Sequence, residues 1–587
     1  MCAEHRFSGA RLAWVALVLL LVVSRLAWLG DRQPHQDEMS HAAFGERLAL
    51  RGSYVADPVF HGPLLYHLEA AVVRVAGPGL WQSRLVPALA GILAAAWLAL
   101  LVGRQAGART GIGVGALASI SPSWLYYSRF AGHDTLVLLV AVALAWAVDA
   151  WERGRGREAA WVGVLAMAAG WATKLNVLFL VVAVLGWGVL RGLAGRANGS
   201  PPPARLPIRA VAAATGVAVV VVAALFVSTL LGVLRDATLP EAVWITIRRA
   251  TVDGILHWSQ MHGQQRIPGP ADYHVVLVAL YEPLLIVGSA ALAWRSWRDS
   301  RVPWWLGPAL LAAGLAMAVA GRYAEGTLAA LSMKPAHLAV VPLVAGVAGV
   351  ALLQALRSGR TWLGFWIWLA ATQGALYAVA GEKTPWLVLH TVLPLLPIAA
   401  FGILGAWEHA THTRGRVVFG GIVAAGAIVA VHGSIALTTY NRSNVGEPLV
   451  QVEYDTQTHD VLREVAQACL SMPSTTPCIV TTDDAAWPAE WYLRWHPAGA
   501  RAVSTDAAAV TAATPFVFVR ASDVVPVSTG THEPRRTRFA SAGRWMAAIR
   551  GGDWRSVLRF LAFREPLGTR VAVPYIHWRH RDKYSHE

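Results

Sequence analysis

The chain has 587 residues, of which 55% are hydrophobic and only 14% are charged, whereas a soluble protein carries about 25% charged residues. This composition excludes an ordinary soluble protein and indicates a polytopic membrane protein. The net charge of +15 is no sign of nucleic-acid binding, because the arginines are scattered over loops and form no single patch.

Long apolar runs predict thirteen membrane-spanning helices. We place them at residues 12–30, 84–102, 111–127, 134–151, 160–173, 176–191, 209–232, 273–294, 304–321, 338–356, 362–381, 387–406 and 417–438. Basic residues are concentrated in one set of loops, which is therefore expected in the cytoplasm. The N-terminus is then cytoplasmic and the C-terminal segment extracytoplasmic, in a multi-pass protein of the cell (plasma or inner) membrane. No convincing small-residue cleavage site follows the first span, so we expect it to remain as an anchor.

Two acids, Asp37 and Glu38, follow the first span in the stretch His35-Gln-Asp-Glu-Met-Ser-His. They lie at a membrane surface, where a carboxylate can take a proton from an attacking hydroxyl. Both are candidate catalytic residues. Because adjacent side chains at a helix start point in different directions, only one is expected to face a site. The alternative is that the acids only stabilise a helix N-terminus through its dipole.

The first outer loop, residues 31–83, has a helical pattern and contains the turn Asp57-Pro-Val-Phe-His-Gly-Pro. Pro and Gly fix such a turn, which would hold His61 at a defined place. His61 could bind a phosphate or hydrogen-bond a sugar, and a structural histidine is the alternative. A second long outer loop covers residues 233–272.

A third outer stretch runs from Ser121 to Asp134 and ends in Arg129, His133 and Asp134 almost at the membrane boundary. A charge there is costly unless it is paired or hydrated. Arg129 and His133 are candidate substrate-binding residues, and Asp134 is a third candidate catalytic acid. The alternative for Asp134 is a purely architectural ion pair with Arg129 or another cation.

Three cations, Lys174, Arg266 and Lys383, lie at the outer ends of spans or in outer loops, against the positive-inside trend. An anionic lipid phosphate would explain them, since Lys and Arg bind phosphate through charge-assisted hydrogen bonds. Glu382, next to Lys383, joins the candidate substrate-binding residues. Snorkelling to ordinary headgroups is the alternative for each cation.

Residues 439–587 are expected to form an extracytoplasmic domain beyond a membrane domain of residues 1–438. A helix at 455–470 and buried strands at 477–482 and 515–520 predict a small α/β fold there. The basic amphipathic stretch 553–564 either lies on the membrane surface or packs on its own domain. Cys469 and Cys478 either form a disulfide, which an extracytoplasmic compartment permits, or stay unpaired and buried.

These stretches together resemble the GT-C superfamily of membrane glycosyltransferases, and more narrowly the flippase-activity-associated family of archaeal-type N-glycosylation. The resemblance spans nearly the whole chain. It rests on His35-Gln-Asp-Glu-Met-Ser-His, Asp57-Pro-Val-Phe-His-Gly-Pro-Leu-Leu-Tyr-His, Ser121-Pro-Ser-Trp-Leu-Tyr-Tyr-Ser-Arg-Phe, His262-Gly-Gln-Gln-Arg-Ile-Pro-Gly-Pro, Gly381-Glu-Lys-Thr-Pro-Trp, Ala486-Trp-Pro-Ala-Glu-Trp-Tyr-Leu-Arg and Phe563-Arg-Glu-Pro-Leu-Gly. The implied relatives are the protein O-mannosyltransferases and the aminoarabinose lipid A transferases.

The resemblance implies a role for each candidate. Asp37 would be the catalytic base, and Asp134 would help to bind the sugar or the acceptor. The donor phosphate would be held by basic residues at outer loop ends, which by position are Lys174, Arg266 and Lys383, with His61 a further candidate. The sequence departs from the family pattern at His133, where a polar Arg or Asn is expected beside the acid, and this affects donor selectivity.

The function expected from these features is inverting transfer of a sugar from a polyprenyl-phosphate donor to a lipid, glycan or protein acceptor outside the cytoplasm. No Gly-x-x-x-x-Gly-Lys-Ser/Thr motif occurs, so the energy would come from the activated lipid. We expect no cofactor and no nucleic-acid partner. A divalent metal is possible but not favoured, because no convincing carboxylate cluster for one is seen. A lipid-sugar flippase or its non-catalytic partner is the alternative function, and a structural membrane scaffold is a third.

Overall fold

The computed structural model describes residues 2–581 apart from 53, 199–204, 265–266, 301, 304, 325, 327, 329–334, 443, 445, 451–453, 473–476, 525–526, 528, 544 and 569. It divides into two compact units. The membrane unit comprises Met1–Leu29 and Phe44–Ser434, and the C-terminal unit comprises Gly30–Ala43 and Ile435–Glu587. The chain boundary near residue 434 lies close to the expected one at 438. The grouping of residues 30–43 with the C-terminal unit was not predicted.

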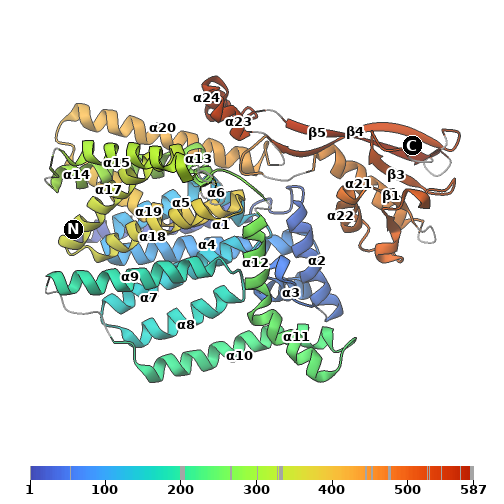
Figure 1. Ribbon diagram of the computed structural model, residues 1–587, viewed down its shortest axis with the longest axis horizontal. Coiled ribbons are helices and arrows are strands. Elements are labelled where there is room, and N and C mark those ends of the chain that lie inside the picture. Colours follow the sequence, from blue (N-terminus) through green and yellow to red (C-terminus); the bar gives the residue numbers. More distant parts are fainter. Residues whose placement is uncertain are drawn as a thin grey trace. The chain divides into compact units, whose positions relative to one another are not determined.

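The membrane unit is built from helices. They are α1 (Cys2–Leu26), α3 (Leu64–Ala76), α4 (Leu80–Ala106), α5 (Ala108–Ile120), α6 (Pro122–Ser128), α7 (Asp134–Glu152), α8 (Gly156–Trp171), α9 (Val177–Asn198), α10 (Ile208–Val233), α11 (Leu239–Thr251), α12 (Asp253–Gln264), α13 (Tyr273–Tyr281), α14 (Pro283–Asp299), α15 (Leu306–Gly321), α17 (Pro335–Arg357), α18 (Thr361–Val379), α19 (Val388–His409) and α20 (Thr413–Thr438). Helices α4, α7, α8 and α10 pack against one another in sequence (Figure 1). Helix α2 (Gln36–Arg51) begins in the C-terminal unit and ends in the membrane unit.

The polytopic membrane class is confirmed by the length and apolarity of these helices. Among the described residues, six helices can cross a membrane, namely Leu80–Ala106, Asp134–Glu152, Val177–Gly195, Ile208–Val233, Pro385–His409 and Thr413–Thr438, and a bent pair would make a seventh. Every one of the predicted spans coincides with a helix or a pair of helices.

Two predicted spans, 111–127 and 273–294, are broken and not continuous. The first breaks at Ser121, between α5 and α6, and the second bends by 103° at Glu282, between α13 and α14. Each break precedes a proline, which disfavours helical backbone in the residue before it. The Glu282 carboxylate accepts hydrogen bonds from the Ser121 hydroxyl (2.7 Å) and the Ser123 backbone N–H (3.1 Å). The two breaks therefore satisfy each other's polar groups, as a membrane interior demands.

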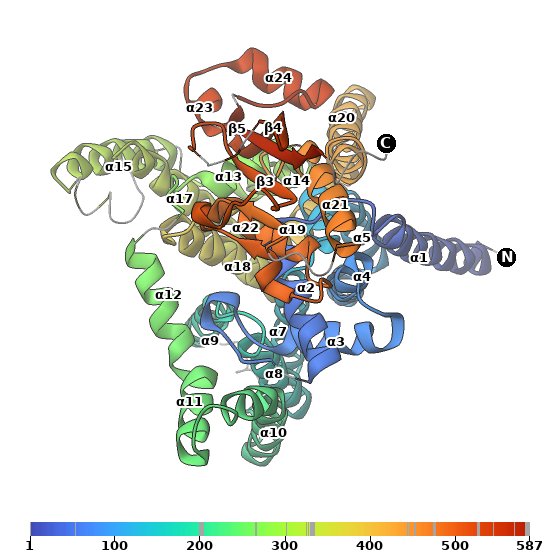
Figure 2. The same cartoon turned by 90° about the vertical axis from the view of Figure 1, so that its right-hand side faces the viewer.

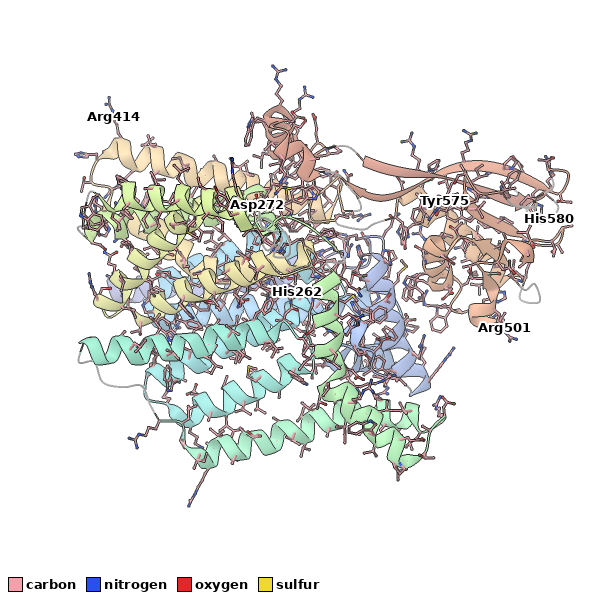
Figure 3. The ribbon with its side chains drawn as sticks, in the orientation of Figure 1. His262, Asp272, Arg414, Arg501, Tyr575 and His580 are labelled. Carbon is pink, nitrogen blue, oxygen red and sulfur yellow. A yellow bond between two sulfur atoms is a disulfide. The ribbon has the colours of Figure 1, made fainter. Side chains whose placement is uncertain are left out.

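The C-terminal unit contains the predicted small sheet, confirming the α/β domain. Its strand order is β2-β1-β3-β5-β4, with β1 (Ile479–Thr481), β2 (Val503–Ser504) and β3 (Phe516–Arg520) parallel and β4 (His532–Gly543) and β5 (Arg570–His580) antiparallel. Helices α21 (Thr456–Leu470) and α22 (Asp483–Tyr492) pack beside it (Figure 2). The ring of Tyr575 on β5 (Figure 3) stacks on Phe518 of β3 and on Phe539 of β4. Cys469 and Cys478 form a disulfide.

Close packing of α14 on α19 depends on two glycines. A Cβ on Gly288 would lie 2.4 Å from the Ala399 carbonyl oxygen, and one on Gly402 would lie 2.0 Å from the Gly288 carbonyl oxygen. Backbone cannot yield as a flexible side chain can, so only glycine allows the helices to approach this closely. Helix α19 carries His390, which contributes to the site described below.

We predict that Gly402→Ala destabilises the membrane unit by about 1–3 kcal/mol, since overpacking forces the helices apart. Gly421→Ala in α20 is the matched control, because its Cβ would meet nothing within 4 Å. Thermal unfolding of the two purified variants in detergent measures the effect. Equal midpoints for both variants would contradict the prediction.

Candidate functional site

The acid pair lies in the first turn of α2, within the C-terminal unit. The buried Glu38 carboxylate forms an ion pair with Arg32 and accepts the His35 backbone N–H at 2.9 Å. A Glu that reaches back to the residue before a helix is half of a capping box. Glu38 therefore holds the helix start in place.

Asp37 is arranged differently. Its side chain is 41% exposed, and one of its carboxylate oxygens lies 4.0 Å from Nδ1 of the His35 ring. The Asp37 backbone N–H donates to Nδ1 of His35 at 3.1 Å, which requires that nitrogen to be unprotonated. Burial lowers the pKa of His35 and so favours the neutral ring. Of the two acids, Asp37 is the one whose carboxylate is open to a substrate. On the other side of the helix start, Tyr454 and Trp487 bind the side chain and carbonyl of Gln36.

In the membrane unit, Asp134 is the centre of a buried polar cluster. Both of its carboxylate oxygens accept from the Lys174 ammonium at 3.0 Å, and the ring Nε2 of His390 lies 3.4 Å from Oδ1. Asp134 opens α7, Lys174 lies in the turn between α8 and α9, and His390 is in the first turn of α19. Buried charges must be paired to persist, and here the pairing joins three separate segments. Asp134 pairs with Lys174, while Arg129 has other partners.

Aromatic rings enclose this cluster. Tyr377 stacks on His390 at 5.1 Å and accepts a hydrogen bond from the Asn176 amide at 3.1 Å. Trp386 lies under the Lys174 ammonium, 6.0 Å from the ring centroid. An aromatic face attracts a cation and leaves it accessible to an anion from another side.

The predicted residues His61 and His133 lie side by side next to the Asp134 cluster, with ring centroids 5.2 Å apart. The Tyr66 hydroxyl donates to the Phe60 carbonyl at 2.7 Å, so His133 must donate from Nε2 to the Tyr66 oxygen at 3.2 Å. His61 has φ of 67° and stacks on Trp258, 4.8 Å between centroids. A positive φ at a residue other than glycine is uncommon and needs support from its surroundings.

The turn that carries His61 is fixed to the end of α8. The backbone N–H groups of Gly62 and Leu64 donate to the carbonyls of Thr173 and Ala172, both at 2.9 Å. A Cβ at Gly62 would lie 2.2 Å from the Ala172 oxygen, so glycine is required there. These bonds place His61 and Lys174 on adjoining segments.

A small polar pocket surrounds His61. Its empty volume is about 470 Å³, open solvent included, and its polar and aromatic lining includes Asp57, His61, Arg249 and Trp258. The Arg249 guanidinium donates to the Ala56 carbonyl at 2.6 Å. Within the described part of the chain it has no other hydrogen-bonding partner, so its remaining N–H groups are available to a ligand.

A larger apolar groove adjoins this pocket. It lies along α8, α10 and α11, and its empty volume is about 1280 Å³ with open solvent included. The groove and the polar pocket share four lining residues, Trp171, Phe226, Ala250 and Thr251. The rest of its lining is almost entirely Ala, Val, Leu and Ile. A pocket that holds a guanidinium and an imidazole and shares its wall with an apolar groove matches a ligand with an anionic head and a long hydrocarbon chain.

Two predicted phosphate-binding cations are used as helix caps. The Arg129 guanidinium donates to the carbonyls of Ser24, Arg25 and Trp28 at the end of α1, each at 3.0 Å. The Lys383 ammonium donates to three carbonyls at the end of α18, those of Tyr377, Ala378 and Ala380. Cations near helix C-termini stabilise the unpaired carbonyls.

The loop that carries Lys383 is fixed from α12 and the residues after it. Nδ1 of His262, a residue labelled in Figure 3, accepts the Gly381 N–H at 2.8 Å. The Lys383 N–H donates to the Ile267 carbonyl at 3.0 Å. Burial lowers the pKa of Lys383 to about 8. Glu382 beside it is half-buried. Arg266 lies outside the described residues.

Sequence reasoning missed His390, Tyr377, Trp258 and Arg249. The signal for Arg249 was present, because Arg248-Arg249 lies in the loop 233–272, which is predicted to be outer, and so runs against the positive-inside trend as Lys174 does. The other three come from apolar or amphipathic helices, where nothing in the local pattern separates them from packing residues. Among the described residues, no group of three or more His, Cys, Asp or Glu side chains is placed to hold a metal ion.

We predict strong coupling between Asp134 and Lys174. Asp134→Leu or Lys174→Met alone leaves a buried charge unpaired and should cost about 3–5 kcal/mol of stability. The double variant should cost clearly less than the sum of the two, because it leaves neither charge behind. Thermal unfolding of the three variants in detergent measures this, and strict additivity would contradict the prediction.

Comparisons with known proteins agree with the resemblance seen in the motifs. Residues 60–223 match the family described as dolichyl-phosphate-mannose-protein mannosyltransferase. This confirms, over that part of the chain, the predicted relationship to the protein O-mannosyltransferases. A search of curated proteins gives no match.

Among solved structures, the chain is similar to ArnT from Cupriavidus metallidurans in the apo state, with 15% identity, 97% of this chain and 98% of that chain covered and a TM-score of 0.48. ArnT from the same organism bound to undecaprenyl phosphate gives 14% identity, the same coverage and a TM-score of 0.46. The oligosaccharyltransferase of Archaeoglobus fulgidus in the apo form gives 14% identity, 84% and 64% coverage and a TM-score of 0.44.

Proposed function

We propose that this protein transfers a sugar from a polyprenyl-phosphate donor to an acceptor hydroxyl on the extracytoplasmic face of the membrane, with inversion at the anomeric carbon. The observation that carries the proposal is the pocket of His61 and Arg249, which shares lining residues with the apolar groove along α8, α10 and α11. The match of residues 60–223 to a mannosyltransferase family supports the same reaction class.

In this proposal the prenyl chain occupies the groove and the phosphate binds in the pocket. The free N–H groups of Arg249 and the ring of His61 would form charge-assisted hydrogen bonds to the phosphate oxygens. Lys174 would add to the positive potential, although part of its charge is already balanced by Asp134. Donors of this kind, aimed at charge that grows as the bond breaks, are each worth about 3–4 kcal/mol in the transition state.

Asp37 would serve as the base. Its carboxylate takes the proton from the acceptor hydroxyl while the acceptor oxygen forms a bond to the anomeric carbon. The bond from that carbon to the phosphate oxygen breaks, and the polyprenyl phosphate leaves with the electron pair. No cofactor is needed in this scheme, since the donor is already activated. Asp134, held by Lys174 and His390, would orient the sugar.

We predict that Asp37→Asn lowers turnover at least about 100-fold, the usual contribution of a general base, and leaves donor binding intact. The assay uses protein in nanodiscs, a panel of radiolabelled polyprenyl-phosphate sugars, and membrane extract as acceptor. Glu38→Gln is the matched control, because Glu38 is buried against Arg32. It should lower thermal stability and keep turnover per folded molecule.

Equal turnover in Asp37→Asn and wild type would show that Asp37 is not the catalytic base. The wild type could instead turn over none of the donors and yet move a lipid-linked sugar across the bilayer of a proteoliposome. That result would contradict the proposed transferase activity and support the flippase function.

We further predict that Arg249→Gln weakens binding of sugar-free polyprenyl phosphate about tenfold or more, the worth of one charge-assisted hydrogen bond of about 1.5–3 kcal/mol. Arg248→Gln is the matched control, since Arg248 is exposed and pairs with Asp253 at 2.6 Å. Binding of radiolabelled lipid to protein in detergent gives the two affinities. Equal affinities would exclude Arg249 from the phosphate site.

A further inference from the structure

Helix α24 (Trp554–Phe563) of the C-terminal unit has an exposed apolar face. Trp554 and Leu558 are each 65% exposed and Phe563 is 70% exposed. Trp554, Leu558 and Ala562 follow one another at four-residue spacing, so they form a single line along the helix. Phe563 comes nine residues after Trp554 and so lies on the opposite side of the helix. The adjacent exposed side chains of Trp554 and Leu558 mark an interaction surface.

The opposite face of α24 is packed on its own unit. Val557, Phe560 and Arg564 are buried, and the Arg564 guanidinium lies over the Phe560 ring at 4.7 Å. The two readings of this amphipathic stretch are therefore compatible. One face of the helix packs inside the unit, and the other is left uncovered among the described residues.

A line of basic residues lies directly beside the line of Trp554, Leu558 and Ala562. Arg555 and Arg559 are exposed and lie in line with Phe563 at the same spacing. Arg559 approaches Glu565 at 3.7 Å, but both side chains are exposed and such a pair is worth little. Aromatic and aliphatic side chains beside arginines are the composition of a helix that lies in the headgroup region of an anionic membrane.

The end of α24 is bound to the segment that follows α20. The Arg564 carbonyl accepts the Asn441 side-chain amide at 2.9 Å, and the Leu567 N–H donates to the Gly446 carbonyl at 3.2 Å. Helix α20 is long and apolar enough to cross a membrane and ends at Thr438, three residues before Asn441. Tyr440, just beyond its end, is also exposed, as aromatic residues at a membrane interface are. These bonds tie the end of α24 to the residues that directly follow the last turn of α20.

We propose that α24 is an interfacial helix, which inserts Trp554 and Leu558 into the membrane surface where α20 ends and binds anionic phospholipid headgroups through Arg555 and Arg559. The occupant of this surface is the bilayer that holds the protein itself. The helix thereby limits the motion of the C-terminal unit. This proposal does not depend on the sugar-transfer reaction.

The test measures depth at one position of α24 in the full chain. Leu558→Cys is made in a Cys2→Ser background and labelled with an environment-sensitive fluorophore, since Cys469 and Cys478 are joined in a disulfide and do not react. The protein is placed in nanodiscs with and without a spin-labelled lipid that quenches fluorescence near the membrane surface. Val524→Cys, at a loop position 96% exposed, is the matched control. Both sites are exposed, so both variants should fold.

We expect a blue-shifted emission and at least twofold quenching at position 558, and neither at 524. In nanodiscs with anionic phospholipid, Arg555→Gln combined with Arg559→Gln should reduce the quenching at 558, and it should have no effect in purely zwitterionic nanodiscs. A label at 558 that behaves like the one at 524 would overturn the proposal and leave the surface for a protein partner. Quenching that is independent of both lipid charge and the arginines would overturn the anionic-headgroup part.

Discussion

The membrane unit depends most on the buried pairing of Asp134 with Lys174 and His390. A carboxylate and an ammonium removed from water must be matched by partners of good geometry, or the unit loses several kcal/mol. The pairing fixes α7, the turn between α8 and α9, and α19 with respect to one another. His133 precedes Asp134 and reaches Tyr66, so the first outer loop is positioned from the same point. The pocket around His61 is a consequence of that arrangement.

The breaks in the helices follow from the same constraint on polar groups. Backbone that leaves a helix inside a bilayer must find partners within the protein. Glu282 supplies them for the interruption at Ser121, and Arg129 and Lys383 supply them for the ends of α1 and α18. Ionisable side chains at outer span ends thus have two roles. Some hold irregular backbone, and others, such as Arg249 with its remaining N–H groups, leave donors for a ligand.

Two adjacent acids at the start of α2, Glu38 and Asp37, take these two roles separately. Glu38 holds backbone, and Asp37 remains open to a ligand. The Glu38 carboxylate binds Arg32 and the His35 backbone N–H, and these contacts fix the helix start. The Asp37 carboxylate remains partly exposed to solvent. The C-terminal unit contributes Tyr454 and Trp487, which bind Gln36. The candidate base is therefore held by residues from the far end of the chain. An interfacial α24 would further restrict the unit to which that base belongs.

The sequence by itself determined the membrane class, the positions of the apolar helices and two of the five strands of the C-terminal sheet. It also singled out Asp37, His61, Asp134 and Lys174 as candidate site residues. These depend on local composition and on charge against an apolar background, both of which can be read along the chain. Only the tertiary structure decided which charges are paired. Lys174 meets Asp134, but Lys383 and Arg129, which carry the same sequence signal, meet helix carbonyls. Partners forty or more residues apart, such as His390 and Asp134, are brought together by packing, and no local pattern encodes that contact.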